Sequence, residues 1–175
     1  MLISKLENND VLLKNLIQYE TSAGSHYKDD FRKKLGSLRE IKTFYLASIG
    51  DVENNERTNN YRHPAINLLQ DIVTKLGKTV DDIHYAYFAI IPPGKMIHVH
   101  SDVEQYYLEI NRYQIFFEMT TDQIIIQKNN YSESNSLVLF DTTIPHGFYN
   151  KSLTEPWYFI VFDIYKDGLQ NPNRP

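Results

Sequence analysis

The second half of the chain alternates hydrophobic and polar residues in short runs that are separated by turn-forming segments. Because successive side chains of a β-strand point to opposite faces, this alternation indicates strands. The 13 tyrosines and 9 phenylalanines favour the same structure, since aromatic residues fit the pleated surface of a sheet. Several short strands joined by polar turns are typical of a β-sandwich or β-barrel. The predicted strands are Ile83–Ile91, Lys95–His100, Arg112–Met119, Gln123–Gln127, Ser136–Phe140, His146–Asn150 and Trp157–Tyr165.

The first eighty residues have a different pattern. Residues 2–20 place apolar side chains at an imperfect helical spacing, which predicts a helix, and Thr43–Ile49 has the composition of a strand. The polar segment Gly50–Tyr61 predicts a loop. Residues Pro64–Gly77 predict a second helix, because proline favours the start of a helix, glycine favours its end, and apolar residues between them lie three and four positions apart. We expect this second helix to pack against the sheet.

Length and composition indicate one domain that spans all 175 residues. A chain of this size buries roughly 70% of its unfolded surface, which is enough for a substantial core. We expect residues 1–80 to form a helical or mixed N-terminal support, residues 81–166 to form the β core and residues 167–175 to form a C-terminal tail. The predicted fold class is therefore mainly β, of the α+β type, with helices from the N-terminal part flanking the core.

Charge and cysteine content exclude several classes of function. The net charge of −4 and the pI near 5.8 argue against a nucleic acid or an acidic membrane as partner, since both favour a basic surface. The absence of cysteine excludes disulfides, thiolate metal sites and thiol nucleophiles. The segment Met1–Glu7 is too polar for the apolar core of a signal peptide, and no apolar run reaches the roughly 18 residues of a membrane span. We expect a soluble cytoplasmic protein.

Two histidines and one aspartate form the strongest candidate for chemistry. His100 and Asp102 are two residues apart at the end of a predicted strand and so share a face, and His146 opens a distant strand. Two imidazoles and one carboxylate are the ligand set of a facial-triad Fe(II) site, which leaves coordination positions open for substrate and dioxygen. His98 is an alternative ligand or a nearby substrate group, and we rank it below His100, which has Asp102 at the two-residue spacing. Any of these residues alone is commonly just a polar side chain near a strand end.

A second candidate is the strand that contains Arg112 and Gln114. Alternation places both of these side chains on one face, opposite Tyr113 and Ile115. A guanidinium forms forked hydrogen bonds with a carboxylate, so an inward Arg112 suits a dicarboxylate co-substrate. The alternative is a solvent-facing arginine paired with Glu118 or Glu109. In the last strand Asp163 lies among apolar neighbours, so if buried it needs a partner, whether it orients a ligand or pins a loop.

Taken in order, these residues resemble the aspartyl/asparaginyl β-hydroxylase family over about residues 88–165. The resemblance implies a double-stranded β-helix fold, the jelly-roll or cupin-like fold. It also implies hydroxylation of an unactivated carbon with Fe(II), 2-oxoglutarate and dioxygen. Carried over by position, His100 and His146 become iron ligands, with Asp102 as the third in the members that use one, and Arg112 becomes a 2-oxoglutarate contact. The matching residues are Pro93, Gly94, His100, Asp102, Asn111–Tyr113, Leu139–Asp141, His146, Asn150, Ile160, Val161 and Asp163.

The chain departs from the family pattern at two positions. Gln114 stands where the family usually has histidine, and a glutamine still donates a hydrogen bond to a carboxylate. Trp157 stands at the position of the arginine that holds one end of 2-oxoglutarate, and an aromatic ring cannot form that ion pair. We therefore expect another cation, such as Lys151 or Lys95, to substitute, or the co-substrate to sit differently near Trp157, or catalysis to be lost.

The sequence thus predicts an Fe(II)/2-oxoglutarate-dependent dioxygenase that hydroxylates an amino-acid or peptidyl side chain. Its cofactors are Fe(II) and 2-oxoglutarate, and its partner is a small-molecule or peptide substrate. The first alternative is a non-catalytic, cupin-like module that binds a metal or a small molecule, and the departure at Trp157 is its main support. A weaker alternative is a metal-dependent cupin enzyme, such as an isomerase, that uses the same ligands without 2-oxoglutarate.

Overall fold

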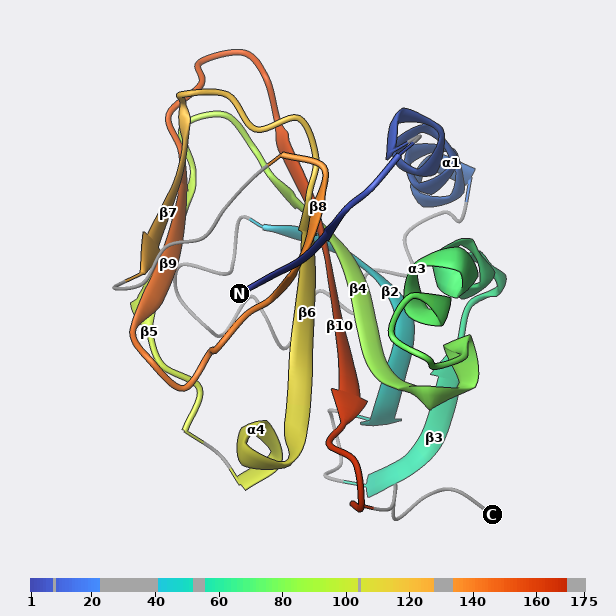
Figure 1. Ribbon diagram of the computed structural model, residues 1–175. Helices are drawn as coiled ribbons and strands as arrows, with labels where there is room; N and C mark the ends of the chain where they lie inside the picture. Colours follow the sequence, from blue (N-terminus) through green and yellow to red (C-terminus); the bar gives the residue numbers. More distant parts are fainter. Residues whose placement is uncertain (8, 23–40, 52–55, 104, 128–133, 170–175) are drawn as a thin grey trace.

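Two antiparallel β-sheets face each other, as the computed structural model shows (Figure 1). The structure describes all residues except 8, 23–40, 52–55, 104, 128–133 and 170–175. The large sheet has the order β1 (Leu2–Lys5), β8 (Ser136–Leu139), β6 (Ile110–Phe116), β10 (Trp157–Tyr165), β4 (Ile83–Ile91), β2 (Lys42–Asp51), β3 (Glu56–Arg62). The small sheet has the order β5 (Met96–His100), β9 (His146–Asn150), β7 (Gln123–Gln127). This arrangement confirms the predicted mainly β, jelly-roll fold class.

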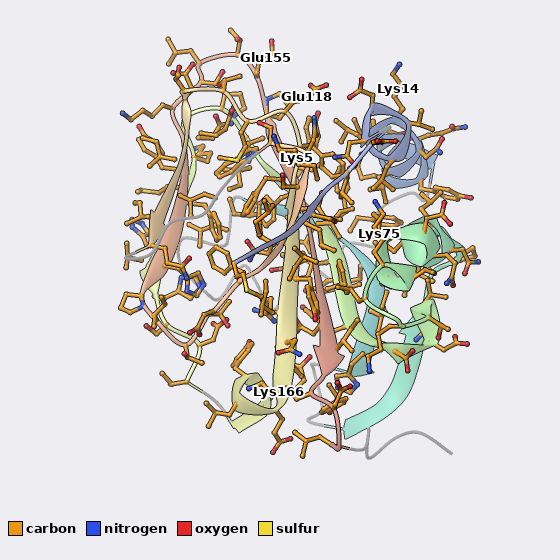
Figure 2. All side chains as sticks on the ribbon, viewed as in Figure 1. Lys5, Lys14, Lys75, Glu118, Glu155 and Lys166 are labelled. Carbon is orange, nitrogen blue, oxygen red and sulfur yellow. The ribbon has the colours of Figure 1, made fainter. Side chains whose placement is uncertain are left out.

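The two central strands of the large sheet divide their side chains between two cores. On β6 and β10, Ile115 and Phe162 belong to a core between the large sheet and the helices, whereas Phe116 and Phe159 belong to a core between the two sheets. The side chains fill the space between the sheets (Figure 2). Because burial on both faces leaves little room for polar groups, the polar residues of these strands collect at one end, where Arg112 and Asp163 are opposite each other in register.

Helices cover the outer face of the large sheet. They are α1 (Asn9–Ser22), the 3-10 helix η2 (Pro64–Leu69) and α3 (Gln70–Thr74), and a second 3-10 turn, η3 (Val80–Asp82), leads into β4 (Figure 1). Leu16 of α1 and Leu69 of η2 are fully buried against the sheet. Charged residues such as Lys14 and Lys75 lie on the outside of this layer (Figure 2). The helix predicted over Pro64–Gly77 therefore has the expected position, although it begins as a 3-10 helix.

Four predicted strands, β4, β7, β9 and β10, have the expected bounds. Two local predictions were wrong. Residues 2–5 form strand β1, which pairs with β8, and Glu56–Arg62 forms strand β3, which pairs with β2, in place of a polar loop. The short helix α4 (Gln105–Glu109) was not predicted. In β1 and β3, hydrogen bonding to a neighbouring strand outweighs the weak local preferences of the segment. Sequence patterns do not report this pairing with a distant strand.

Close approach of β5 and β9 depends on Gly147. A Cβ atom at this position would lie 2.9 Å from the carbonyl oxygen of Ile97 and 3.2 Å from the Cα of Val99. Both contacts are with backbone atoms, so no side-chain rotation relieves them. The absence of a side chain at Gly147 is what lets the strand ends that carry His100 and His146 lie together.

Replacing Gly147 by alanine is therefore expected to push the two strands apart. Overpacking of this kind costs about 1–3 kcal/mol of unfolding free energy. Urea denaturation of the purified proteins measures the loss. An alanine variant with the stability of the original chain would contradict this reading of the β5–β9 contact.

No helix within the described part of the chain is long and apolar enough to cross a membrane.

Candidate metal centre

His100 and His146 come from neighbouring strands of the small sheet. His100 ends β5 and His146 begins β9, and the antiparallel register pairs these two residues directly. The register shifts between Ile97 and His100, so an irregularity in β5 adjusts the direction of the His100 side chain. The two imidazole rings lie with their centroids 4.4 Å apart.

Backbone hydrogen bonds fix the tautomer of both rings. Nδ1 of His100 lies 2.8 Å from the carbonyl oxygen of His98, and Nδ1 of His146 lies 3.0 Å from that of Ile144. A carbonyl oxygen only accepts, so each Nδ1 carries the hydrogen and each Nε2 keeps its lone pair. Burial lowers the pKa of His146 below its ordinary value, against the opposing effect of the Ile144 carbonyl. With Nδ1 engaged by a backbone carbonyl, each ring keeps Nε2 as the nitrogen that could bind a metal.

Asp102 supplies a carboxylate to the same place. Its backbone N–H donates to the carbonyl oxygen of Thr142 at 2.8 Å, which ties the end of β5 to the turn before β9. Its Oδ1 lies 3.8 Å from Nε2 of His100. The ligand atoms of His100, Asp102 and His146 all lie within 4.8 Å of one another. Ligands about 2.1 Å from one cation lie about 3 Å apart, so small side-chain rotations bring these three to a shared metal.

A buried ion-pair network holds Asp102 from behind. Nε and Nη2 of Arg112 donate to the two carboxylate oxygens of Asp163 at 2.8 and 2.7 Å, and Nη1 donates to Oδ2 of Asp102 at 3.0 Å. The Tyr106 hydroxyl donates to Asp163 at 2.9 Å, and Cζ of Arg112 lies 4.8 Å from the Tyr107 ring centroid. Asp163 is 0% exposed and Arg112 8%. Burial lowers the pKa of Arg112, but Asp163 outweighs it and raises the pKa above its ordinary value.

The ligand group opens into a cavity of about 110 Å³ between the two sheets. Its wall combines polar and apolar side chains, which suits a small polar molecule held in a fixed orientation. Gln114 lines it as well, and its buried Oε1 has no hydrogen-bond partner among the described protein atoms. Burial raises the pKa of the Tyr107 hydroxyl to about 12, so it stays protonated as a donor. The lining residues are Ile41, Tyr85, Tyr87, Ala89, Ile97, His100, Asp102, Tyr107, Arg112, Gln114, Thr142, His146, Phe148 and Phe159.

Other predicted site residues lie elsewhere. Trp157 is 1% exposed and packs among Phe116, Phe148 and Phe159 in the core between the sheets, so it does not line the cavity as a co-substrate contact would. Neither Lys95 nor Lys151 is among the lining residues. His98 is exposed and belongs neither to the His100, Asp102 and His146 group nor to the residues that line the cavity. Among the described lining residues, Arg112 is the one arginine or lysine.

Several residues of the site were not predicted from the sequence. Tyr106 and Tyr107 lie on the short helix α4, whose five residues show no clear period. The sequence could have indicated Tyr85 and Tyr87. They alternate with buried residues along β4 and share a face with Ala89, which also lines the cavity. The alternative of a solvent-facing Arg112 does not hold: Arg112 is buried, and it pairs with Asp163 and Asp102.

Fold and site together define a class: a double-stranded β-helix protein whose two sheets enclose a His-Asp-His group able to hold a metal. The sequence profile of the aspartyl/asparaginyl beta-hydroxylase family matches residues 7–167. The chain belongs to this family of hydroxylases, as its sequence resemblance predicted.

Solved structures are similar to this chain at low sequence identity. AviO1 from Streptomyces viridochromogenes Tue57 is 13% identical with a TM-score of 0.51, covering 93% of this chain and 84% of its own. The non-heme monooxygenase ThoJ in complex with nickel is 13% identical with a TM-score of 0.46, covering 94% and 72%. An RmlC-like cupin protein from Desulfovibrio desulfuricans is 13% identical with a TM-score of 0.33, covering 46% and 70%. Among curated proteins, none matches the sequence.

Proposed function

We propose that this protein is an Fe(II)- and 2-oxoglutarate-dependent dioxygenase that hydroxylates an amino-acid or peptidyl side chain. The observation that carries the proposal is the convergence of His100, Asp102 and His146 at one cavity, with both imidazoles held as Nε2 donors. Membership in a hydroxylase family supports the reaction type. Two nitrogen donors and one carboxylate suit Fe(II) and leave coordination positions open.

The charge of the site favours a divalent cation followed by a dianion. The negative charges of Asp102 and Asp163 and the positive charge of Arg112 sum to one net negative charge when the histidines are neutral. A divalent metal reverses this to one net positive charge, which attracts a dicarboxylate such as 2-oxoglutarate into the cavity. Iron supplies the activation of dioxygen, while the chain positions the reactants and excludes water.

Two side chains of β6 are suited to the far carboxylate of 2-oxoglutarate. The hydrogen bonds to Asp163 and Asp102 use three of the five N–H groups of Arg112, so one N–H remains on each Nη atom. Gln114 lies two residues along the same face and also lines the cavity, and its side-chain NH2 group is the kind of donor that a carboxylate needs. In the proposed reaction one oxygen atom of dioxygen enters the substrate as hydroxyl, the other enters succinate, and carbon dioxide leaves.

The size and wall of the cavity support a substrate that inserts one small group. A volume of about 110 Å³ lies below the roughly 300 Å³ at which pockets enclose a whole drug-sized ligand. Tyr85, Tyr87 and Tyr107 line the same cavity and present rings with polar tips. A single side chain of an amino acid or peptide fits this entrance better than a large rigid molecule does.

Anaerobic addition of Fe(II) and 2-oxoglutarate is expected to produce a weak visible charge-transfer band. Aerobic incubation with amino acids and peptides is then expected to release succinate, measured by chromatography. Omission of 2-oxoglutarate controls for other absorbing iron species. Absence of the band, together with absence of succinate for every substrate tried, would count against the proposal.

A second candidate is a non-catalytic metal-binding module of cupin type. Its support is that Arg112 already forms ion pairs with two carboxylates. The described wall of the cavity therefore offers 2-oxoglutarate no cation that is not already paired. Because a ligand that binds only the native state raises stability, melting temperatures separate the two candidates. A rise with metal and no further rise with 2-oxoglutarate favours the binding module, whereas a further rise favours the dioxygenase.

A further inference from the structure

A guanidinium buried between two carboxylates lies directly behind the candidate metal ligands. We infer that Arg112, held in place by Asp163, is a positioning residue that sets the orientation and the charge of the metal ligand Asp102. The inference rests on the metal binding of the proposed function and assigns a role to residues that do not themselves touch the metal.

The two carboxylate oxygens of Asp102 have different neighbours. Oδ2 accepts from Nη1 of Arg112 at 3.0 Å, and Oδ1 lies 3.8 Å from Nε2 of His100. The arginine thus occupies one oxygen and turns the other toward the histidines. A carboxylate fixed in this way donates through one oxygen only, which keeps coordination positions open for other ligands.

Asp163 makes this use of Arg112 possible. It receives two parallel hydrogen bonds from the guanidinium at 2.8 and 2.7 Å, an arrangement with little freedom to rotate. It also cancels the charge of Arg112, which would otherwise repel a divalent cation bound by Asp102. The Tyr106 hydroxyl donates to Asp163 at 2.9 Å and fixes the carboxylate in turn. Strand pairing supports the same geometry, since Asp163 and Arg112 are opposite each other on β10 and β6.

The test measures binding of Co(II), which favours the same N/O ligands and binds more tightly than Fe(II). Affinity is obtained by chelator competition, and the visible spectrum of bound Co(II) reports the ligand geometry. Asp163→Asn keeps the shape of the side chain and removes its charge. We expect the affinity to fall about 10- to 100-fold, the usual effect of losing a group that supports a metal ligand, and the spectrum to shift. Asp167→Asn, at a side chain 90% exposed, is the matched control and is expected to bind as the original chain does.

Two further variants keep the test decisive if Asp163→Asn does not fold. Tyr106→Phe removes only the hydroxyl that fixes Asp163 and is expected to weaken Co(II) binding severalfold. The double variant Arg112→Gln with Asp163→Asn removes both buried charges together and is expected to fold but to bind Co(II) at least about 10-fold more weakly. Folded variants that keep the original affinity and spectrum would overturn the inference.

The result also separates this inference from the proposed function. If the original chain does not bind Co(II), the metal site and the proposed function both fail. If it binds Co(II) and the folded Asp163 and Arg112 variants bind equally well, the proposed function stands and the positioning role alone is wrong.

Discussion

Replacing His146 by alanine is expected to abolish metal binding. The variant loses one of three ligands, so Co(II) affinity should fall by at least about 100-fold, beyond the usual effect of a supporting residue. Metal at about 100 times its dissociation constant stabilises the original chain by about 2.7 kcal/mol, and the variant should show no such gain. Calorimetric melting with and without Co(II) measures the difference. The metal-induced shift is the relevant quantity, because His146 also packs against Phe140 and Phe148 and its loss lowers the stability of the apoprotein.

His98→Ala is the matched control for this prediction. The Nδ1 of His100 donates to the backbone carbonyl of His98, so alanine at position 98 preserves that hydrogen bond. Co(II) affinity should stay close to that of the original chain. The opposite result, with His98→Ala losing the metal and His146→Ala keeping it, would exclude the His100, Asp102, His146 ligand set.

Replacing Arg112 by glutamine is expected to cause the largest loss of stability. Asp163 would then stay fully buried with only the Tyr106 hydroxyl as donor, and removing one partner of a buried ion pair costs about 3–5 kcal/mol. For a chain of this length that corresponds to a fall of roughly 10 °C in melting temperature. Urea unfolding of the apoprotein gives the free energy directly.

A second substitution tests the cause of that loss. Adding Asp163→Asn to the Arg112→Gln variant removes the unpaired charge, so most of the lost unfolding free energy should return. The metal affinity of this double variant should remain low, because Asp102 has still lost its hydrogen-bond donor. A double variant that is as unstable as Arg112→Gln alone would show that lost packing, not an unpaired carboxylate, determines the effect.

The alternation of the strands was sufficient to predict which residues share a face. It placed Arg112 and Gln114 together on one face of β6, and both line the cavity, whereas Ile115 belongs to the core on the opposite face. These predictions succeed because the two-residue period is a local property of an extended chain. Residue type and spacing also picked out His100, Asp102 and His146, and resemblance to a family supported joining segments that local patterns leave separate; the structure brings the three together.

Other features of the site depend on contacts between distant segments. The sequence gives no sign that Arg112 pairs with Asp163, fifty-one residues away, in preference to Glu109 or Glu118 nearby. That choice follows from the register of β6 against β10, which is set by packing of both strand faces. Strand β3 and helix α4 were not predicted for the same reason, because their stability comes from neighbouring segments and not from their own composition.

By itself, the sequence determined most of the strands, their faces and the residue types available for a metal, because these depend on neighbours two to four positions away. Only the tertiary structure decided which of those residues meet. It assigned Trp157 to the aromatic core and not to the cavity, and it placed Arg112 between two aspartates. The physical reason is that a buried charge requires a partner and a buried aromatic ring requires apolar neighbours, and strand pairing alone determines which of these is within reach.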